Sequence, residues 1–238
     1  MTQMTRRAAA MLLIATAAIG GCAKKNETAS GDVNAVATVS DTQPASADSA
    51  PVTPAPARSA ESIVANDGKA AAIQAALAED AIVSDPRGQW AIAATASSTY
   101  SGDKAPTAKT SYSAFAATGA PNVERYGDNG HAWTSATADK GIEWLEVQFE
   151  KPVNATQIRI RQSYGPGAII KVEVIGEDGT RRTVWQGLDD QTYPANTISW
   201  FDRTFEKTAF KVNGARITLA TNAVAGWNEI DAVQLLGD

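Results

Sequence analysis

Apolar and polar residues alternate most clearly along residues 141–162, GIEWLEVQFEKPVNATQIRIRQ. Every second residue is apolar in each half of this segment, and the stretch KPVNAT separates the halves. A period of two is typical of half-buried strands, so the segment predicts two antiparallel strands and their connection. A helix is excluded because Pro152 would lie in its interior. The inward positions of the two strands are Leu145, Val147, Phe149, Ile158 and Ile160.

Shorter segments of the same character precede and follow this pair, with Gly, Pro, Asn and Asp turns between them. The strongest turn signal is EDGT at residues 177–180, which is typical of a β-hairpin. Seven or eight short strands with no helix among them predict an all-β, antiparallel sandwich over residues 86–238. The other expected strands are residues 90–100, 170–174, 183–185, 198–205, 215–219 and 229–236.

The pattern changes before residue 86. Residues 59–85 place Ile73, Leu77 and the surrounding alanines at helical spacing, and Pro86 follows. They predict a short helix that leads into the domain, with an unfolded linker and a partner-binding helix as the alternatives. Residues 22–58 are rich in Ala, Ser, Thr and Pro and contain few large apolar side chains, so they predict a disordered tether.

Residues 1–21 have the features of a secretory signal peptide, because Arg6 and Arg7 precede an apolar stretch too short to span a bilayer. The leader runs into IGGC, which resembles the lipobox of bacterial lipoproteins. This resemblance implies that Cys22, the only cysteine, is diacylated with palmitate-type chains. More than one acyl chain is what stable membrane anchoring requires. We therefore expect a lipid-anchored protein of the bacterial envelope, on the outer membrane and facing the periplasm or the cell surface.

Composition and motifs exclude several classes of function. A formal net charge of −5 argues against nucleic acid as a partner. His131 is the only histidine, so a catalytic site built on several histidines is excluded. The sequence has neither a Gly-x-Ser-x-Gly elbow nor a Gly-rich phosphate loop. Asp189 and Asp190 are adjacent carboxylates, but their loop is typical of a solvated turn and not of a glycosidase pair. We predict that the protein is not an enzyme.

Six segments, in this order, resemble the discoidin family, also called coagulation factor 5/8 type C domains. The segments are ATASSTY (94–100), AFAATGAPN (114–122), HAWTSAT (131–137), WLEVQFEKPVNATQIRI (144–160), KVEVIGEDGTRRTVWQG (171–187) and EIDAVQLLG (229–237). The resemblance implies a galactose-binding-like jelly-roll sandwich. It also implies a binding module for glycans, and in some members for anionic lipids or proteins, with contacts on loops at one end.

Several members of that family hold a structural calcium ion. The resemblance implies that its ligands here would be Asn122, Glu229 and Asp231. Calcium requires several oxygen ligands at once. The chain departs from the family in two respects, since it lacks the cysteine pair that bridges the domain ends and has Thr118-Gly119 where Asp-Gly is common.

Two expected loops offer side chains suited to sugars. Arg161 and Tyr164 lie where the second strand of residues 141–162 runs into a loop, and Trp227 and Asn228 precede the last strand. Aromatic faces stack on sugar C–H groups, while Arg and Asn bind hydroxyls. These four residues are our predicted ligand contacts, provided that both strands point the same way. The alternatives are that Trp227 plugs the core and that Tyr164 caps the sandwich.

The sequence as a whole favours a non-catalytic binding module on a membrane-anchored lipoprotein, which recognises carbohydrate or cell-envelope glycan through its end loops. The alternative is a structural or assembly lipoprotein that binds a protein partner in the envelope.

Overall fold

The computed structural model describes residues 60–102, 109 and 111–238. The expected signal peptide (1–21), the lipidation site Cys22 and the tether (22–58) lie outside the described residues. The first described element is α1 (Ala60–Val83), the helix expected before the domain. No helix in the described part of the chain is long and apolar enough to cross a membrane.

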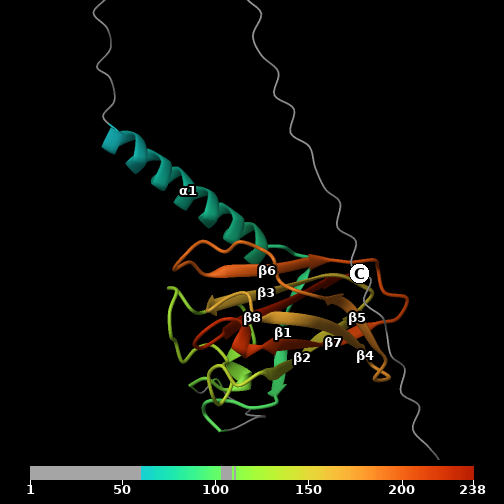
Figure 1. The fold of residues 1–238 in the computed structure, drawn as a ribbon. Helices are drawn as coiled ribbons and strands as arrows, with labels where there is room; N and C mark the ends of the chain where they lie inside the picture. The colour runs from blue at the N-terminus through green and yellow to red at the C-terminus, as the bar shows by residue number, and fades with distance from the viewer. Residues whose placement is uncertain (1–59, 103–108, 110) are drawn as a thin grey trace, which may run out of the picture. The chain divides into compact units, whose positions relative to one another are not determined.

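Within the described residues, eight antiparallel strands form the domain, so the expected all-β sandwich is confirmed. They pair in the order β5-β4-β7-β2-β1-β8-β3-β6 (Figure 1). β1 joins two layers, because its first residues pair with β8 and its later residues with β2. The strands are β1 (Gly88–Ala96), β2 (Ile142–Val153), β3 (Ala155–Tyr164), β4 (Ile169–Gly176), β5 (Arg181–Gln186), β6 (Ser199–Thr204), β7 (Val212–Ala220) and β8 (Glu229–Gly237), and two 3₁₀ helices, η1 (Ala114–Ala117) and η2 (Thr221–Ala223), lie between them.

The two strands of residues 141–162 form as β2 and β3, but they do not pair with each other. β2 pairs with β1 and β7, whereas β3 pairs with β6 and β8. Asn154 lies between them and exchanges backbone hydrogen bonds with Asp238. The predicted antiparallel strands and their alternation are therefore confirmed, and the structure adds that the two strands lie in different layers. Two strands that face each other across a sandwich bury every second residue, as a hydrogen-bonded pair does.

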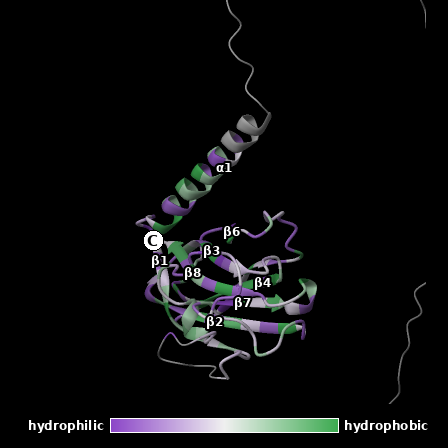
Figure 2. Cartoon of the chain, turned by 90° about the vertical axis from the view of Figure 1, so that its left-hand side faces the viewer, coloured by the Kyte–Doolittle hydropathy of each residue, from purple (hydrophilic) through white to green (hydrophobic). Residues whose placement is uncertain are grey.

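Apolar side chains from both layers fill the interior. The five inward positions expected in β2 and β3 are at most 4% exposed. The hydropathy colouring of Figure 2 shows the resulting bands of hydrophobic and hydrophilic residues along β2. Burial of large side chains at about 1.5 to 3 kcal/mol each is the main driving force for this arrangement.

The C-terminal end of α1 is attached to the outer face of the sheet by polar contacts. Trp200 Nε1 donates to Glu79 Oε2 over 2.5 Å, and Gln234 Nε2 donates to the carbonyl of Ile82 over 3.1 Å. The apolar side chains Ile73 and Leu77 are 49% and 59% exposed. The helix is therefore held at its end and not by an apolar face.

Candidate ligand-binding site

Loops from four parts of the chain are joined at one end of the sandwich by hydrogen bonds. The Tyr100 amide donates to the carbonyl of Thr134, and the Tyr112 amide donates to the carbonyl of Gly130. The side-chain amide of Asn228 donates to the carbonyl of Gly165 over 2.7 Å. These bonds join residues that are 18 to 63 positions apart in the sequence.

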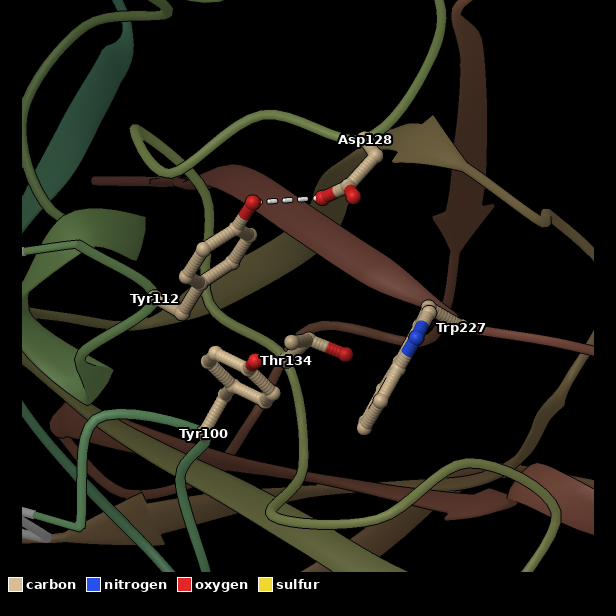
Figure 3. A pocket seen from close by; sticks show the side chains of 5 residues that line it. All are labelled: Tyr100, Tyr112, Asp128, Thr134 and Trp227. Carbon is tan, nitrogen blue, oxygen red and sulfur yellow. Dashed lines mark hydrogen bonds between the residues drawn. The ribbon is translucent and has the colours of Figure 1, made fainter.

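A pocket of about 180 Å³ lies among these loops (Figure 3). Its lining consists of three aromatic side chains, one carboxylate and one threonine, from Tyr100, Tyr112, Trp227, Asp128 and Thr134. The Tyr100 ring contacts Tyr112 and Trp227 edge-to-face, with centroid distances of 5.1 and 5.5 Å. Figure 3 shows Asp128 on one side of the space between the rings and Thr134 on the opposite side.

Two hydroxyl groups of the pocket, those of Tyr112 and Thr134, are oriented by their own hydrogen bonds. Tyr112 donates its phenolic proton to Asp128 Oδ1 over 2.5 Å, and this bond, together with burial, raises the pKa of Tyr112 to about 12. Thr134, which is 2% exposed, donates its proton to the carbonyl of Asn228 over 3.0 Å. Both hydroxyl oxygens therefore keep only acceptor capacity for a ligand.

The backbone of Tyr112 lies in an unusual region, with φ of 58°. A bulky residue rarely occupies the left-handed region, because its side chain then crowds its own backbone. Residues held in such conformations concentrate at binding and catalytic sites. The strain thus supports the aromatic pocket as a functional feature.

Asp128 interacts with a second carboxyl group, that of Glu229, which is only 1% exposed. It accepts a hydrogen bond from the Asn129 amide at 3.3 Å and one from the Ser163 hydroxyl at 3.4 Å. Burial raises the pKa of Glu229 to about 8, and the neighbouring Asp128 carboxylate contributes to the rise. Glu229 is therefore mostly protonated at neutral pH.

Of the predicted ligand contacts, only Trp227 lines this pocket. It is half-buried at the domain end and does not belong to the buried core. Asn228 is 5% exposed and joins two loops through its bond to Gly165. The loop geometry requires glycine at 165, since its φ is 53° and a Cβ there would lie 2.3 Å from the carbonyl oxygen of Trp227.

Tyr164 lines a separate, open concavity of about 370 Å³. Its ring packs edge-to-face on Tyr126 at 5.3 Å, and Tyr193 and Pro194 form another wall. His131 is exposed on a different groove, beside Arg125. The sandwich end therefore carries more than one hollow, and the predicted residues are divided between them.

Arg161 does not lie at the surface, where we expected it to meet a ligand. It is 7% exposed, and its Nη1 contacts Asp231 Oδ2 at 2.5 Å and donates to the Val123 carbonyl at 2.8 Å. Its Nε lies 2.9 Å from Glu79 Oε1 at the end of α1. The guanidinium is occupied by these partners, because a buried charge requires pairing. Its role in the structure is to connect α1, β3 and β8.

The residues expected to bind calcium do not fit that ion. Asp231 accepts from the amides of Asn122 and Val123 and pairs with Arg161, so its oxygens face donors. Glu229 likewise accepts from an amide and a hydroxyl. Among the described residues, no group of three or more His, Cys, Asp or Glu side chains could hold a metal ion. Calcium requires several free oxygens converging on one point.

Sequence reasoning missed Tyr100, Tyr112 and Asp128. From the sequence, Tyr100 is expected at the end of a strand, Tyr112 at the start of a short structured segment and Asp128 in a polar loop. A large aromatic residue within a loop of Ser, Gly and Asp residues is a weak indication of a binding site. Nothing in the linear order indicated that these loops meet, because the hydrogen bonds that join them are long-range.

Comparisons with known proteins bear on the family and the fold. The family model described as "Pappalysin-1, SD scarf domain, C-terminal" matches residues 83–238. No curated protein matches the chain. Among solved structures, chitosan-binding module 1 of a chitosanase/glucanase from Paenibacillus sp. IK-5 aligns with 15% identity and a TM-score of 0.46, covering 63% of this chain and 99% of that one.

Two further structures align at a similar level. The family 32 carbohydrate-binding module of C. perfringens NanJ, solved with galactose, has 16% identity and a TM-score of 0.43 and covers 62% of this chain and 98% of its own. The family 32 module of Streptococcus pneumoniae EndoD has 10% identity and a TM-score of 0.43, with coverages of 63% and 99%. The discoidin resemblance stays a prediction. The family match begins at the last residue of α1 and covers the whole sandwich. This chain therefore belongs to the family of the C-terminal SD scarf domain of pappalysin-1.

Proposed function

We propose that the sandwich is a non-catalytic glycan-binding module and that its ligand enters the pocket of Tyr100, Tyr112, Trp227, Asp128 and Thr134. The observation that carries the proposal is the grouping of three aromatic rings with hydrogen-bonding oxygens in one hollow at the loop end. Apolar walls with a few oriented polar groups are the usual composition of a small-ligand site. Aromatic faces also match the C–H surfaces of sugar rings.

A catalytic function is not supported by the same residues. Glycosidases place two carboxyl groups on opposite sides of the scissile bond, roughly 5 to 10 Å apart. Here Asp128 and Glu229 interact directly with each other, and Glu229 is too buried to reach a substrate. His131, the only histidine of the chain, lines a different groove. The pocket can therefore bind a ligand but lacks a positioned acid and base.

The proposal is tested with the full chain, purified in mild detergent, on an array of envelope and host glycans, followed by calorimetry on the best ligand. Replacing Trp227 with alanine should weaken binding at least about 10-fold, because it removes one wall of the pocket. Leu188→Ala, which shortens a side chain that is 80% exposed, is the matched control and should bind normally. A folded protein that binds no glycan, or a Trp227→Ala variant of full affinity, would contradict the proposal.

We further propose that Cys22 anchors the chain to the outer membrane through acyl chains. The support is the IGGC motif directly after an apolar leader. Metabolic labelling with a clickable palmitate analogue should label the native chain but not a Cys22→Ala variant. Equal labelling of both would refute the anchor.

A further inference from the structure

We propose that the aromatic pocket is selective for a primary ammonium group, such as the free amine of an amino sugar. This inference rests on the proposed glycan-binding function and names the class of ligand at that site. Three independent features support it: the charge balance, the hydrogen-bonding direction of the lining oxygens, and the contrast with the neighbouring concavity.

Asp128, the carboxylate that lines the pocket, and Glu229, which interacts with it, have no cationic partner among the described residues. Neither Asp128 nor Glu229 lies within ion-pair distance of a described Lys, Arg or His. Elsewhere in the sandwich, the fully buried side chains of Asp189 and Asp231 each pair with an arginine. The pocket therefore presents one carboxylate without an ion-pair partner among the described residues, that of Asp128. A cationic ligand would supply the missing charge.

The rings add to the same electrostatic preference. The face of an aromatic ring carries partial negative charge, which attracts ammonium groups held within about 6 Å of its centre. Tyr100, Tyr112 and Trp227 line one hollow together with a carboxylate. An anion there would be repelled by both kinds of group.

Three lining oxygens favour a ligand group that donates several hydrogen bonds. Tyr112 has given its proton to Asp128, and Thr134 has given its proton to the Asn228 carbonyl. The oxygens of Tyr112, Thr134 and Asp128 can therefore only accept hydrogen bonds from a ligand. A primary ammonium has three N–H donors and no acceptor, so it matches three accepting oxygens. A quaternary ammonium has no donor and would leave them unsatisfied.

The second concavity serves as an internal comparison. It is also aromatic, with Tyr126, Tyr164 and Tyr193, and it is larger, at about 370 Å³. No carboxylate lines it, and the Tyr193 hydroxyl donates its hydrogen bond to Asp189, which does not line the concavity. A neutral sugar face suits that surface, whereas the 180 Å³ pocket suits one small charged group. The asymmetry places charge selectivity at Asp128.

The test compares a glucosamine oligosaccharide with its N-acetylated counterpart of equal length, by calorimetry on the full chain in chelator-containing buffer. We expect the amine form to bind at least about 10-fold more tightly. Asp128→Asn should reduce that preference to about 2-fold or less, while the exposed-loop control Asp190→Asn should keep it. Tyr112→Phe retains the ring but removes one accepting oxygen, so its preference for the amine form should be intermediate between those of the two Asp variants. Thermal unfolding of each variant establishes that it is folded.

The outcomes separate this inference from the proposed function. Equal affinity for the two oligosaccharides would overturn ammonium selectivity and leave glycan binding standing. Binding of neither would overturn both. Competition by choline as strong as that by glucosamine would also overturn the inference, because a quaternary ammonium cannot use the accepting oxygens. Retention of the amine preference in folded Asp128→Asn would show that the selectivity lies elsewhere, against the proposal.

Discussion

Replacing Glu229 with glutamine should change how the stability of the domain depends on pH. In the folded protein the pKa of Glu229 is raised from an ordinary value of 4.5 to about 8, mainly by burial. Between these two values the folded state holds a proton that the unfolded state has released. Stability therefore decreases as pH rises through this window and is greatest, for this group, below the unfolded pKa. Glutamine resembles the protonated acid at every pH and removes the effect.

The magnitude follows from the width of the window. Each pH unit within it changes the free energy of unfolding by about 1.4 kcal/mol for a single group. Raising the pH from 5.5 to 7.5 should thus lower the free energy of unfolding of the wild type by about 3 kcal/mol through Glu229. This is a large share of the 5 to 15 kcal/mol by which domains are usually stable. The variant should gain about that amount relative to the wild type over the same range.

Urea unfolding at pH 5.5, 6.5 and 7.5, followed by tryptophan fluorescence, measures this difference directly. Glu150→Gln, at an exposed position of β2, is the matched control and should run parallel to the wild type. If the Glu229→Gln curve also runs parallel to the wild type, Glu229 is ionised at neutral pH and the reasoning from burial fails. Ligand-free protein is required, because a bound ligand would add its own linkage.

Two further predictions concern the contacts that replaced our expected site residues. Asp231→Asn should lower the free energy of unfolding, measured by urea titration, by about 3 kcal/mol, because it leaves the buried guanidinium of Arg161 without its nearest carboxylate. A loss below about 1 kcal/mol would mean that the pair is not buried in solution. Millimolar calcium or a chelator should leave the melting temperature unchanged, because the carboxylates of Glu229 and Asp231 already accept from protein donors. A calcium-dependent rise of several degrees would restore the calcium site that the contacts argue against.

The strands and their inward faces could be predicted from sequence, because a half-buried strand shows apolar and polar residues that alternate with a period of two. Val147 and Ile160 are fully buried, as their parity required. The partners of those strands could not be predicted in the same way. β2 and β3 are adjacent in sequence yet lie in different layers, and the same alternation satisfies either arrangement.

The residues of the candidate site could likewise be predicted only in part. Trp227 could be chosen from the sequence because it is an aromatic residue in the loop directly before the last strand, although a position in the core was the alternative. Tyr100, Tyr112 and Asp128 became a site only when long-range hydrogen bonds brought their loops to one end. Arg161 has the right chemistry for a sugar, but the docking of α1 and the position of Asp231 bury it.

The sequence by itself determined which residues are strands, which face is apolar, and which motifs and residue types are present for chemistry. Only the tertiary structure decided which of those residues meet, which charges are compensated and which remain open to a ligand. The physical reason is that hydrophobic periodicity depends on neighbours a few residues apart, whereas a pocket depends on contacts such as that of Thr134 with Asn228, across 94 positions.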